Sequence, residues 1–248
     1  MYKKENWFQD WFNSPYYHKL YADRDEREAG DFIEALLNHL RPPADARMLD
    51  VACGRGRHAK ILASKGYDVT GIDLAPANID YALRSAGDQL QFYQQDMRMP
   101  FWINYFDYAF NFFTSFGYFK TEREHVTAIR NISHSLRNRG VFVLDYLNAE
   151  WVQERLVPAS EKKKGSVTFL LTRWSDKTHF YKSIRIRDTD LPEELEFIER
   201  VARFSLDDFE KMFQANSLII QEVFGDYQLQ AYEPKRSPRL ILIAKKEG

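Results

Sequence analysis

The 248-residue chain contains one cysteine, Cys53, so no disulfide can form within it, and an oxidising compartment receives no support. Its 35 basic and 36 acidic side chains leave a formal net charge of −1, which argues against binding to nucleic acid or an anionic membrane. No apolar run approaches the ~18 residues of a membrane span, and the first residues lack the apolar stretch of a secretory signal. These absences predict a soluble, cytoplasmic protein.

Hydrophobic residues make up 44% of the chain and aromatic residues 15%, which is enough for a large core. Short apolar runs alternate with helical patterns, as in a parallel sheet with helices on both faces. The predicted strands cover residues 47–52, 67–73, 90–96, 106–113, 141–146, 217–224 and 238–246. The linker 225–237 is too short for a crossover helix, so the last two strands should pair antiparallel. We therefore expect an α/β, Rossmann-like three-layer sandwich around a seven-stranded, mostly parallel sheet whose last strand is antiparallel.

The helices have recognisable ends. One over 57–65 stops at Gly66, and the next starts at Pro76 with an apolar stripe of Ile79, Ala82 and Leu83. A third has Thr121 as N-cap and Glu124 three residues later, which forms a capping box. Its apolar face carries Val126, Ile129, Ile132 and Leu136, and we expect it to end at Gly140. A further helix covers 206–216, and the segment 15–40 also has a helical pattern, closed by Pro42 and Pro43.

Residues 160–204 break this rhythm. After the charged tract 161–164, three runs alternate at a period of two residues (166–174, 178–187 and 196–204), which predicts a small antiparallel sheet between the fifth and sixth strands. We expect an N-terminal helical cap over 1–44, a core formed by 45–159 and 205–248, and an inserted antiparallel β subdomain over 160–204. The insertion would serve as an acceptor lid or an oligomer contact.

The segment that carries the most chemical information is the glycine turn after the first strand. Gly54 and Gly56 allow a tight turn into a helix and a close approach of a ligand to the backbone. Asp73 ends the second strand, where it can accept hydrogen bonds from a ribose diol. A nicotinamide dinucleotide and S-adenosylmethionine both suit this pattern. Asp50, just before the turn, would repel a pyrophosphate and attract a sulfonium and an ammonium, so we favour S-adenosylmethionine.

Four motifs carry a family resemblance: LDVACGRGRH (49–58), GIDLA (71–75), QQDMR (94–98) and FNFFTSFGYF (110–119). With them the chain resembles class I S-adenosylmethionine-dependent methyltransferases. Within that class it is most similar to the small-molecule group that includes sugar N-methyltransferases and has an inserted antiparallel sheet.

The resemblance implies a set of cofactor-binding residues. The methionine half would contact Asp50, Ala52, Cys53, Gly54 and Gly56, and His58 occupies a position where several relatives have histidine. Asp73 would hold the ribose and Leu74 would pack on the adenine. Asp96 would accept from the adenine amine, with Met97 beside it, and Asn111 and Phe112 would lie under the cofactor.

Acceptor residues should come from the carboxyl ends of the fourth and fifth strands and from the amino-terminal segment. The substrate candidates are Thr114, Ser115, Phe116, Tyr118, Tyr146 and Asn148, and the catalytic candidates are Tyr17, His18, Tyr21 and Asp145. The histidines are scattered, and none has metal-ligand spacing to Cys53, so no metal is expected.

These observations predict a methyltransferase that moves a methyl group by direct displacement from S-adenosyl-L-methionine to a nitrogen or oxygen of a small molecule, leaving S-adenosyl-L-homocysteine. The chain would act on a small-molecule acceptor without nucleic acid or membrane, and a homodimer is left open. Two alternatives remain: an NAD(P)-dependent oxidoreductase using the same glycine turn, and a non-catalytic S-adenosylmethionine-binding protein.

Overall fold

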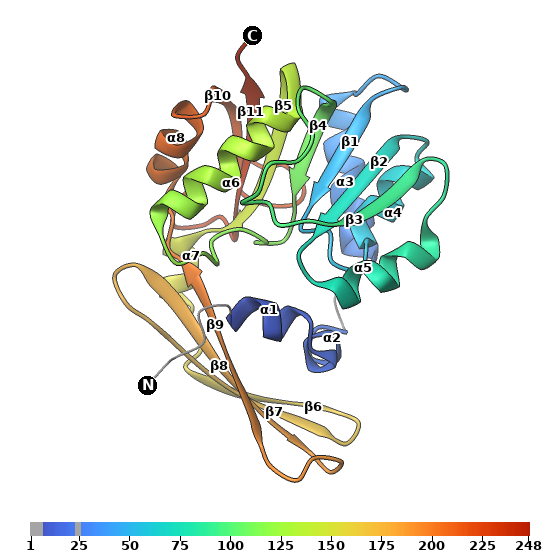
Figure 1. The fold of residues 1–248 in the computed structure, drawn as a ribbon. Helices are drawn as coiled ribbons and strands as arrows, with labels where there is room; N and C mark the ends of the chain where they lie inside the picture. The colour runs from blue at the N-terminus through green and yellow to red at the C-terminus, as the bar shows by residue number, and fades with distance from the viewer. Residues whose placement is uncertain (1–6, 23–25) are drawn as a thin grey trace.

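A computed structural model describes residues 7–22 and 26–248. Its main feature is a seven-stranded sheet in the order β10-β11-β5-β4-β1-β2-β3 (Figure 1). The strands are β1 (Arg47–Val51), β2 (Asp68–Asp73), β3 (Leu90–Gln94), β4 (Phe106–Asn111), β5 (Leu136–Leu147), β10 (Leu218–Phe224) and β11 (Arg239–Lys246). All pairs are parallel except those of β11, which is antiparallel to β10 and β5. The predicted sheet and its antiparallel last strand are confirmed.

Helices cover both faces of the sheet, which confirms the three-layer sandwich. One face carries α3 (Glu26–Leu40), α4 (Arg57–Ser64) and α5 (Pro76–Ala82), and a short 3-10 helix (Leu83–Ser85) follows α5. The other face carries α6 (Glu122–Ser135) and α8 (Leu206–Gln214). Both of these helices begin with a capping box, at Thr121 and at Ser205, which satisfies backbone N–H groups at their first turns.

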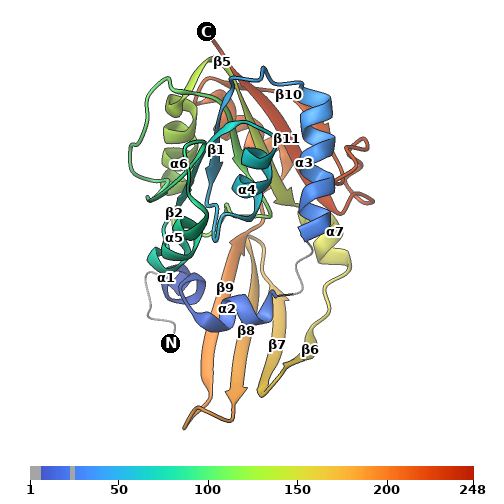
Figure 2. The same cartoon turned by 90° about the vertical axis from the view of Figure 1, so that its right-hand side faces the viewer.

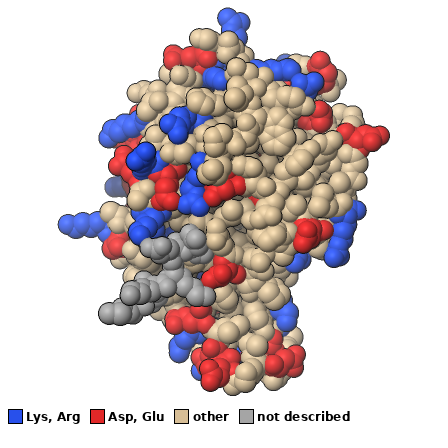
Figure 3. Space-filling view, viewed as in Figure 1, with Lys and Arg blue, Asp and Glu red and all other residues tan. Residues whose placement is uncertain are grey.

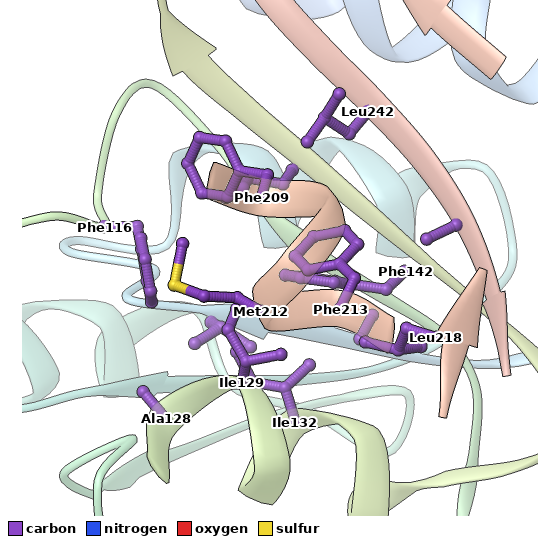
Figure 4. Close-up of a cluster of buried hydrophobic side chains, with 14 of the residues drawn as sticks. Phe116, Ala128, Ile129, Ile132, Phe142, Phe209, Met212, Phe213, Leu218 and Leu242 are labelled. Atoms are coloured by element: carbon purple, nitrogen blue, oxygen red, sulfur yellow. The ribbon is translucent and has the colours of Figure 1, made fainter. Parts of the chain in front are cut away.

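Side chains spaced by three and four residues produce these faces. On α8, Phe209, Met212 and Phe213 are buried against Ile129 and Ile132 of α6, as Figure 4 shows. One predicted stripe is wrong at its end. Ile79 and Ala82 are buried, but Leu83 is 48% exposed, because α5 gives way to the 3-10 helix there and the side chain leaves the apolar face.

The end predicted for α6 is also wrong. The helix stops at Ser135, whereas Leu136 and Gly140 belong to β5. The backbone N–H groups of Asn104 and Tyr105 donate to the carbonyls of His134 and Ser135 at 2.8 Å each. The loop before β4 therefore donates hydrogen bonds to the last carbonyls of the helix, and Leu136 pairs with Phe106 of β4 instead of continuing the helix.

The insertion forms a separate antiparallel sheet below the first in Figure 1, in the order β6-β7-β8-β9. Its strands are β6 (Ala159–Lys164), β7 (Val167–Ser175), β8 (His179–Asp188) and β9 (Leu195–Ala202). The sequence predicts the last three strands but not β6, which runs through the lysine tract. β6 is an edge strand whose side chains are mostly exposed, so its sequence has no apolar alternation. It is a strand because its backbone pairs with β7.

Two short helices, α1 (Trp7–Phe12) and α2 (Pro15–Leu20), lie between the two sheets at the carboxyl ends of the parallel strands (Figures 1 and 2). Phe8 of α1 is buried with the main core, while Trp11 is buried with the inserted sheet. The third amino-terminal helix, α3, instead packs on the main sheet beside α4. A helix of only six residues, such as α1, is too short for its apolar spacing to define a helix from the sequence alone.

A further helix, α7 (Ala149–Glu154), leads from β5 toward the insertion. Within the part of the chain that the structure describes, no helix is both long and apolar enough to cross a bilayer. On the face drawn in Figure 3, basic and acidic side chains are interspersed on the left and around the edges, while the centre is mostly uncharged.

Candidate active site

The candidate site lies where the strand order reverses between β1 and β4, which is where α/β sheets bind ligands. A cavity of about 70 Å³ opens there under α1. It is lined by Phe8, Gln9, Phe12, Ala52, Ile72, Asp73, Leu74, Ala75, Gln95, Asp96, Met97, Ser115, Tyr118 and Phe119. A second cavity of about 270 Å³ shares Gln9, Leu74 and Ala75 with it and extends past Pro76 and Gln94. The two cavities adjoin at these shared residues, near the ends of β2 and β3, and are called the cleft below.

The turn after β1 runs in the left-handed backbone region at Ala52, Gly54 and Gly56, with φ of 60°, 57° and 77°. A Cβ added to Gly54 would meet no atom within 4 Å, so bare backbone faces open space there. A Cβ on Gly56 would lie 2.5 Å from the Phe92 ring. Gly54 therefore leaves the backbone open to a ligand, whereas Gly56 allows the turn to pack on the core.

Asp73 ends β2 on the cleft wall. Its Oδ2 accepts from the Gly54 backbone N–H at 2.9 Å, and its Oδ1 accepts from the Ala75 backbone N–H at 2.8 Å. Asn78 also donates to Oδ1, at 3.3 Å. Burial raises the pKa of Asp73, although these hydrogen bonds oppose the shift. The carboxyl group thus ties the glycine turn to β2 and keeps one edge toward the cleft.

Asp50 is buried beneath the turn and does not line the cavity. Its Oδ2 accepts from the Ala59 backbone N–H at 3.1 Å, so it caps α4 in place of the side chain that Gly56 lacks. Burial, aided by the charge of Asp73, raises the pKa of Asp50 to about 8. Cys53 is also buried, and burial raises the pKa of its thiol. The acid predicted to select the ligand by its charge therefore lies behind the glycine turn, where it stays protonated up to about pH 8 and caps α4.

Asp96 and Met97 line the cavity at the end of β3, as the sequence predicts. The Asp96 carboxylate is held by Arg98, whose Nη2 donates to Oδ2 at 2.7 Å. The backbone carbonyl of Met97 accepts from Asn131 of α6 at 3.2 Å, which fixes the Met97 side of the wall. Leu74 completes an apolar wall from the end of β2.

Seven predicted cofactor residues lie outside the cavity lining: Asp50, Cys53, Gly54 and Gly56 of the turn, and His58, Asn111 and Phe112. Phe112 is buried and stacks on His58, with 4.4 Å between the ring centroids. Asn111 donates to the Val51 carbonyl at 2.9 Å and joins β4 to β1, while its Oδ1 is buried without a partner. The structure thus places His58 and Phe112 in a packed aromatic stack, and Asn111 at the floor between the two strands.

Of the substrate candidates, Ser115 and Tyr118 line the cavity. The Tyr118 hydroxyl donates to the Thr114 carbonyl at 2.7 Å, and its ring packs on Trp7 and Phe12 of α1. Ser115 donates to the Phe112 carbonyl at 2.8 Å. The segment after β4 therefore reaches the cleft through Ser115 and Tyr118.

Three of the other four substrate candidates, Phe116, Tyr146 and Asn148, are buried elsewhere. Phe116 packs in the main core, and the Tyr146 hydroxyl donates to the Ala202 carbonyl at 2.7 Å. Asn148 caps α7 and donates to the Ser237 carbonyl at 2.7 Å, which ties the loop before β11 to the end of β5. None of these three side chains lines the described cavity.

The carboxyl group of Asp145 forms an ion pair and a hydrogen bond with neighbouring residues. Arg239 of β11 pairs with it at 2.6 Å, and the Phe113 backbone N–H donates to it at 2.7 Å. Arg239 also donates to the Thr114 hydroxyl at 2.9 Å. Burial alone would lower the pKa of Arg239, but Asp145 outweighs it and holds that pKa above its ordinary value. Asp145 therefore fixes the left-handed turn at Phe113 and Thr114, whose φ angles are 59° and 56°.

The amino-terminal candidates lie on α2 and just after it, against the inserted sheet. The Tyr21 hydroxyl donates to Glu199 at 2.8 Å and also contacts Lys182, which pairs with Glu199. Tyr17 packs edge-on against Trp11 and Phe12, and His18 lies beside Tyr17. These contacts fasten α2 to the insertion, and none of the three predicted residues lines the cavity.

The sequence analysis missed the residues that α1 contributes to the cavity wall, namely Phe8, Gln9 and Phe12. Their signal is the aromatic cluster Trp7, Phe8, Trp11 and Phe12, which is far more apolar than an exposed terminus requires. It also missed Arg98 and Arg239, whose roles depend on contacts between segments that sequence spacing does not relate.

Comparisons with known proteins agree with this geometry. Residues 48–140 match the family described as a methyltransferase domain. A protein of Bacillus subtilis (strain 168) described as a methyltransferase is 34% identical over 120 residues, which cover 46% of this chain and 45% of that protein. A dTDP-3-amino-3,4,6-trideoxy-alpha-D-glucopyranose N,N-dimethyltransferase of Streptomyces venezuelae is 30% identical over 118 residues, or 48% of each chain. The chain thus spans about half the length of these two relatives.

Solved structures resemble the chain over nearly its whole length. An S-adenosylmethionine-dependent methyltransferase from Clostridium acetobutylicum has a TM-score of 0.78 at 21% identity, covering 94% of this chain and 96% of that one. An amino pentose methyltransferase from Micromonospora echinaspora has a TM-score of 0.71 at 22% identity, covering 94% and 97%. Residues 48–140 are therefore similar to a methyltransferase domain, and the fold of the chain is that of the class I S-adenosylmethionine-dependent methyltransferases.

Proposed function

We propose that the protein transfers a methyl group from S-adenosylmethionine to a nitrogen or oxygen atom of a small molecule. The observation that carries the proposal is the cleft itself, which Asp73 and Asp96 line at two neighbouring strand ends while Asp73 accepts from the backbone N–H of Gly54 in the adjoining turn. Two carboxylates and apolar walls suit a ribose, an adenine and a cationic sulfur, whereas a pyrophosphate would meet negative charge.

The residues present fit this cofactor, which supplies an electrophilic methyl group on a sulfonium. Asp73 would accept from the ribose hydroxyls and Asp96 from the adenine amine, with Leu74 and Met97 packing on the base. Gly54 would bring its backbone against the methionine half. The buried, unpartnered Oδ1 of Asn111 is a further acceptor at the floor of the site between β1 and β4.

The protein's part in the reaction is to hold the acceptor in line with the methyl group and keep water out. When bound, the cofactor would supply the methyl group to the acceptor lone pair and would leave as the neutral thioether, and the acceptor proton would pass to solvent. Ser115 and Tyr118 are the polar side chains best placed to orient the acceptor, because both line the cavity after β4. No residue is needed as a strong base when the acceptor is a neutral amine.

A small acceptor is favoured by the enclosure of the site. α1 forms the outer wall of the cleft, and α2 and the inserted sheet lie directly beyond it (Figure 2). We infer that the insertion closes the acceptor side of the site as a lid, which leaves little room for a macromolecule. The amino-sugar methyltransferases among the relatives and solved structures make an amine on a sugar the first acceptor to try.

The test is transfer of an isotope-labelled methyl group from S-adenosylmethionine into a metabolite extract, followed by mass spectrometry. The proposal expects a labelled small molecule with the wild type and none with Asp73→Asn. Cofactor binding without any labelled product across extracts would favour a non-catalytic binding protein.

A further inference from the structure

Arg98 lies just behind the cavity wall and contacts three of the residues that line it. Its guanidinium is bonded to Asp96 and lies 5.7 Å from the ring centroid of Phe8 and 5.0 Å from that of Phe119. Its side chain is 21% exposed. Arg98 thus connects the end of β3, the helix α1 and the segment after β4 at one point.

The Asp96 carboxylate is held along its whole edge. The Arg98 Nε lies 3.1 Å from each carboxylate oxygen, and Nη2 donates to Oδ2 at 2.7 Å. The Arg98 backbone N–H donates to Oδ1 at 2.8 Å. An arginine in this geometry fixes the plane of a carboxylate, which a lysine cannot do. The carboxylate can therefore present only one edge to the cavity.

The other side of Arg98 is anchored as firmly. Its Nη1 donates to Glu124 at 2.6 Å, and Glu124 also accepts from the Thr121 backbone N–H in the capping box of α6. Burial opposes the ionisation of Glu124, but the bonds from Thr121 and Arg98 outweigh it and lower its pKa. Arg98 is therefore held between two carboxylates, one on the cavity wall and one on a helix end.

We propose that Arg98 is a positioning residue that sets the choice of nucleobase, by holding Asp96 so that the site accepts a 6-amino purine and rejects a 6-oxo purine. The inference rests on the proposed function and deepens it. An adenine amine donates a hydrogen bond to the oriented carboxylate. A hypoxanthine presents a carbonyl oxygen at the same place, where two acceptors face each other and neither is satisfied.

The experiment compares the dissociation constants of S-adenosylhomocysteine and S-inosylhomocysteine by calorimetry. A site built around a substrate N–H rejects an analogue that lacks it, so we expect the wild type to prefer the adenosyl compound at least about 30-fold. R98M should lower this preference at least about tenfold, and R98K, which keeps the charge but not the fork, should fall between them. R137M is the control, because Arg137 pairs with Asp107 at the far end of β4 and should leave the preference unchanged.

The readout is the ratio of the two dissociation constants, because a residue with a merely structural role would change both affinities but not their ratio. An R98M protein with the wild-type preference overturns the proposal, and so does a wild type that binds both compounds equally. Loss of both ligands by a folded R98K protein also overturns it, because Arg98 would then serve binding as a whole. If the Arg98 variants do not fold, the E124Q variant tests the proposal by the same ratio of dissociation constants. Glutamine keeps the capping box but removes the ion pair, and a fall of about threefold or more is expected.

A wild type that binds neither compound contradicts the proposed function itself. That result differs from every outcome assigned to Arg98, since each of those requires a wild type that binds S-adenosylhomocysteine.

Discussion

Replacing Asp73 with asparagine should weaken binding of S-adenosylhomocysteine by about 100-fold. A hydrogen bond to a charged group contributes about 1.5–3 kcal/mol, and the variant loses the charge toward both ribose hydroxyls, so a loss of about 3 kcal/mol is expected. The carboxylate also accepts from Gly54 at 2.9 Å and from Ala75 at 2.8 Å. An amide has one oxygen, so one of these backbone N–H groups would face an NH₂ group, at a cost to stability of about 1–3 kcal/mol.

Calorimetric titration at 25 °C measures the affinity, and thermal unfolding measures the cost to the fold. Asp68→Asn is the matched control. Asp68 begins the same strand at its other end, half-exposed and 3.8 Å from Arg47, so its loss should leave the affinity unchanged. A folded Asp73→Asn protein whose dissociation constant lies within about threefold of the wild type would refute the assignment of Asp73 to the ribose.

Three other changes test the structural argument. Because burial raises the pKa of Asp50 to about 8, the folded chain keeps a proton that the unfolded chain loses from about pH 4 upward. Asp50 therefore makes the fold less stable as pH rises toward 8, and Asp50→Asn should remove this part of the pH dependence of the unfolding free energy. Urea titrations that give the same pH dependence for the variant and the wild type from about pH 5 to 8 would contradict this. Arg239→Met leaves Asp145 buried without its partner and should cost about 3–5 kcal/mol in unfolding free energy, whereas a loss below about 1 kcal/mol would be inconsistent with a buried pair. Gly56→Ala should cost about 3 kcal/mol, from its left-handed φ of 77° and the Phe92 ring, and Gly54→Ala about 1 kcal/mol; a reversed order of melting temperatures would count against the roles given to the two glycines.

The sequence predicts the main sheet well because its strands are buried on both faces. Runs such as residues 141–146 are apolar almost throughout, and capping residues such as Thr121 mark helix starts within a few positions. The failures have tertiary causes. The carbonyls at the end of α6 are taken by the loop before β4, and β6 is a strand because β7 supplies its hydrogen bonds. The loop before β4 is distant from the end of α6 in the sequence. β7 directly follows β6, but the lysine-rich run of β6 has no apolar alternation that would indicate a strand.

The same division holds for the site. Ala52, Asp73, Leu74, Asp96 and Met97 lie at or shortly after strand ends, where the motifs draw attention to them, and all five line the cavity. The residues on the acceptor side are harder to predict, because a polar side chain at a strand end can point toward the cleft or toward a structural partner. Asp145 was a catalytic candidate, yet it pairs with an arginine 94 residues later in the chain. The local sequence does not indicate whether such a side chain faces the cleft or a structural partner.

The central claim is that the cleft at the ends of β1, β2 and β3 binds an S-adenosyl compound. The most direct measurement is calorimetric titration of the wild-type chain with S-adenosylhomocysteine and, in parallel, with reduced nicotinamide adenine dinucleotide. The account predicts one-to-one binding of the first at about micromolar affinity and no heat from the second. Binding of the dinucleotide, with none of S-adenosylhomocysteine, would contradict it.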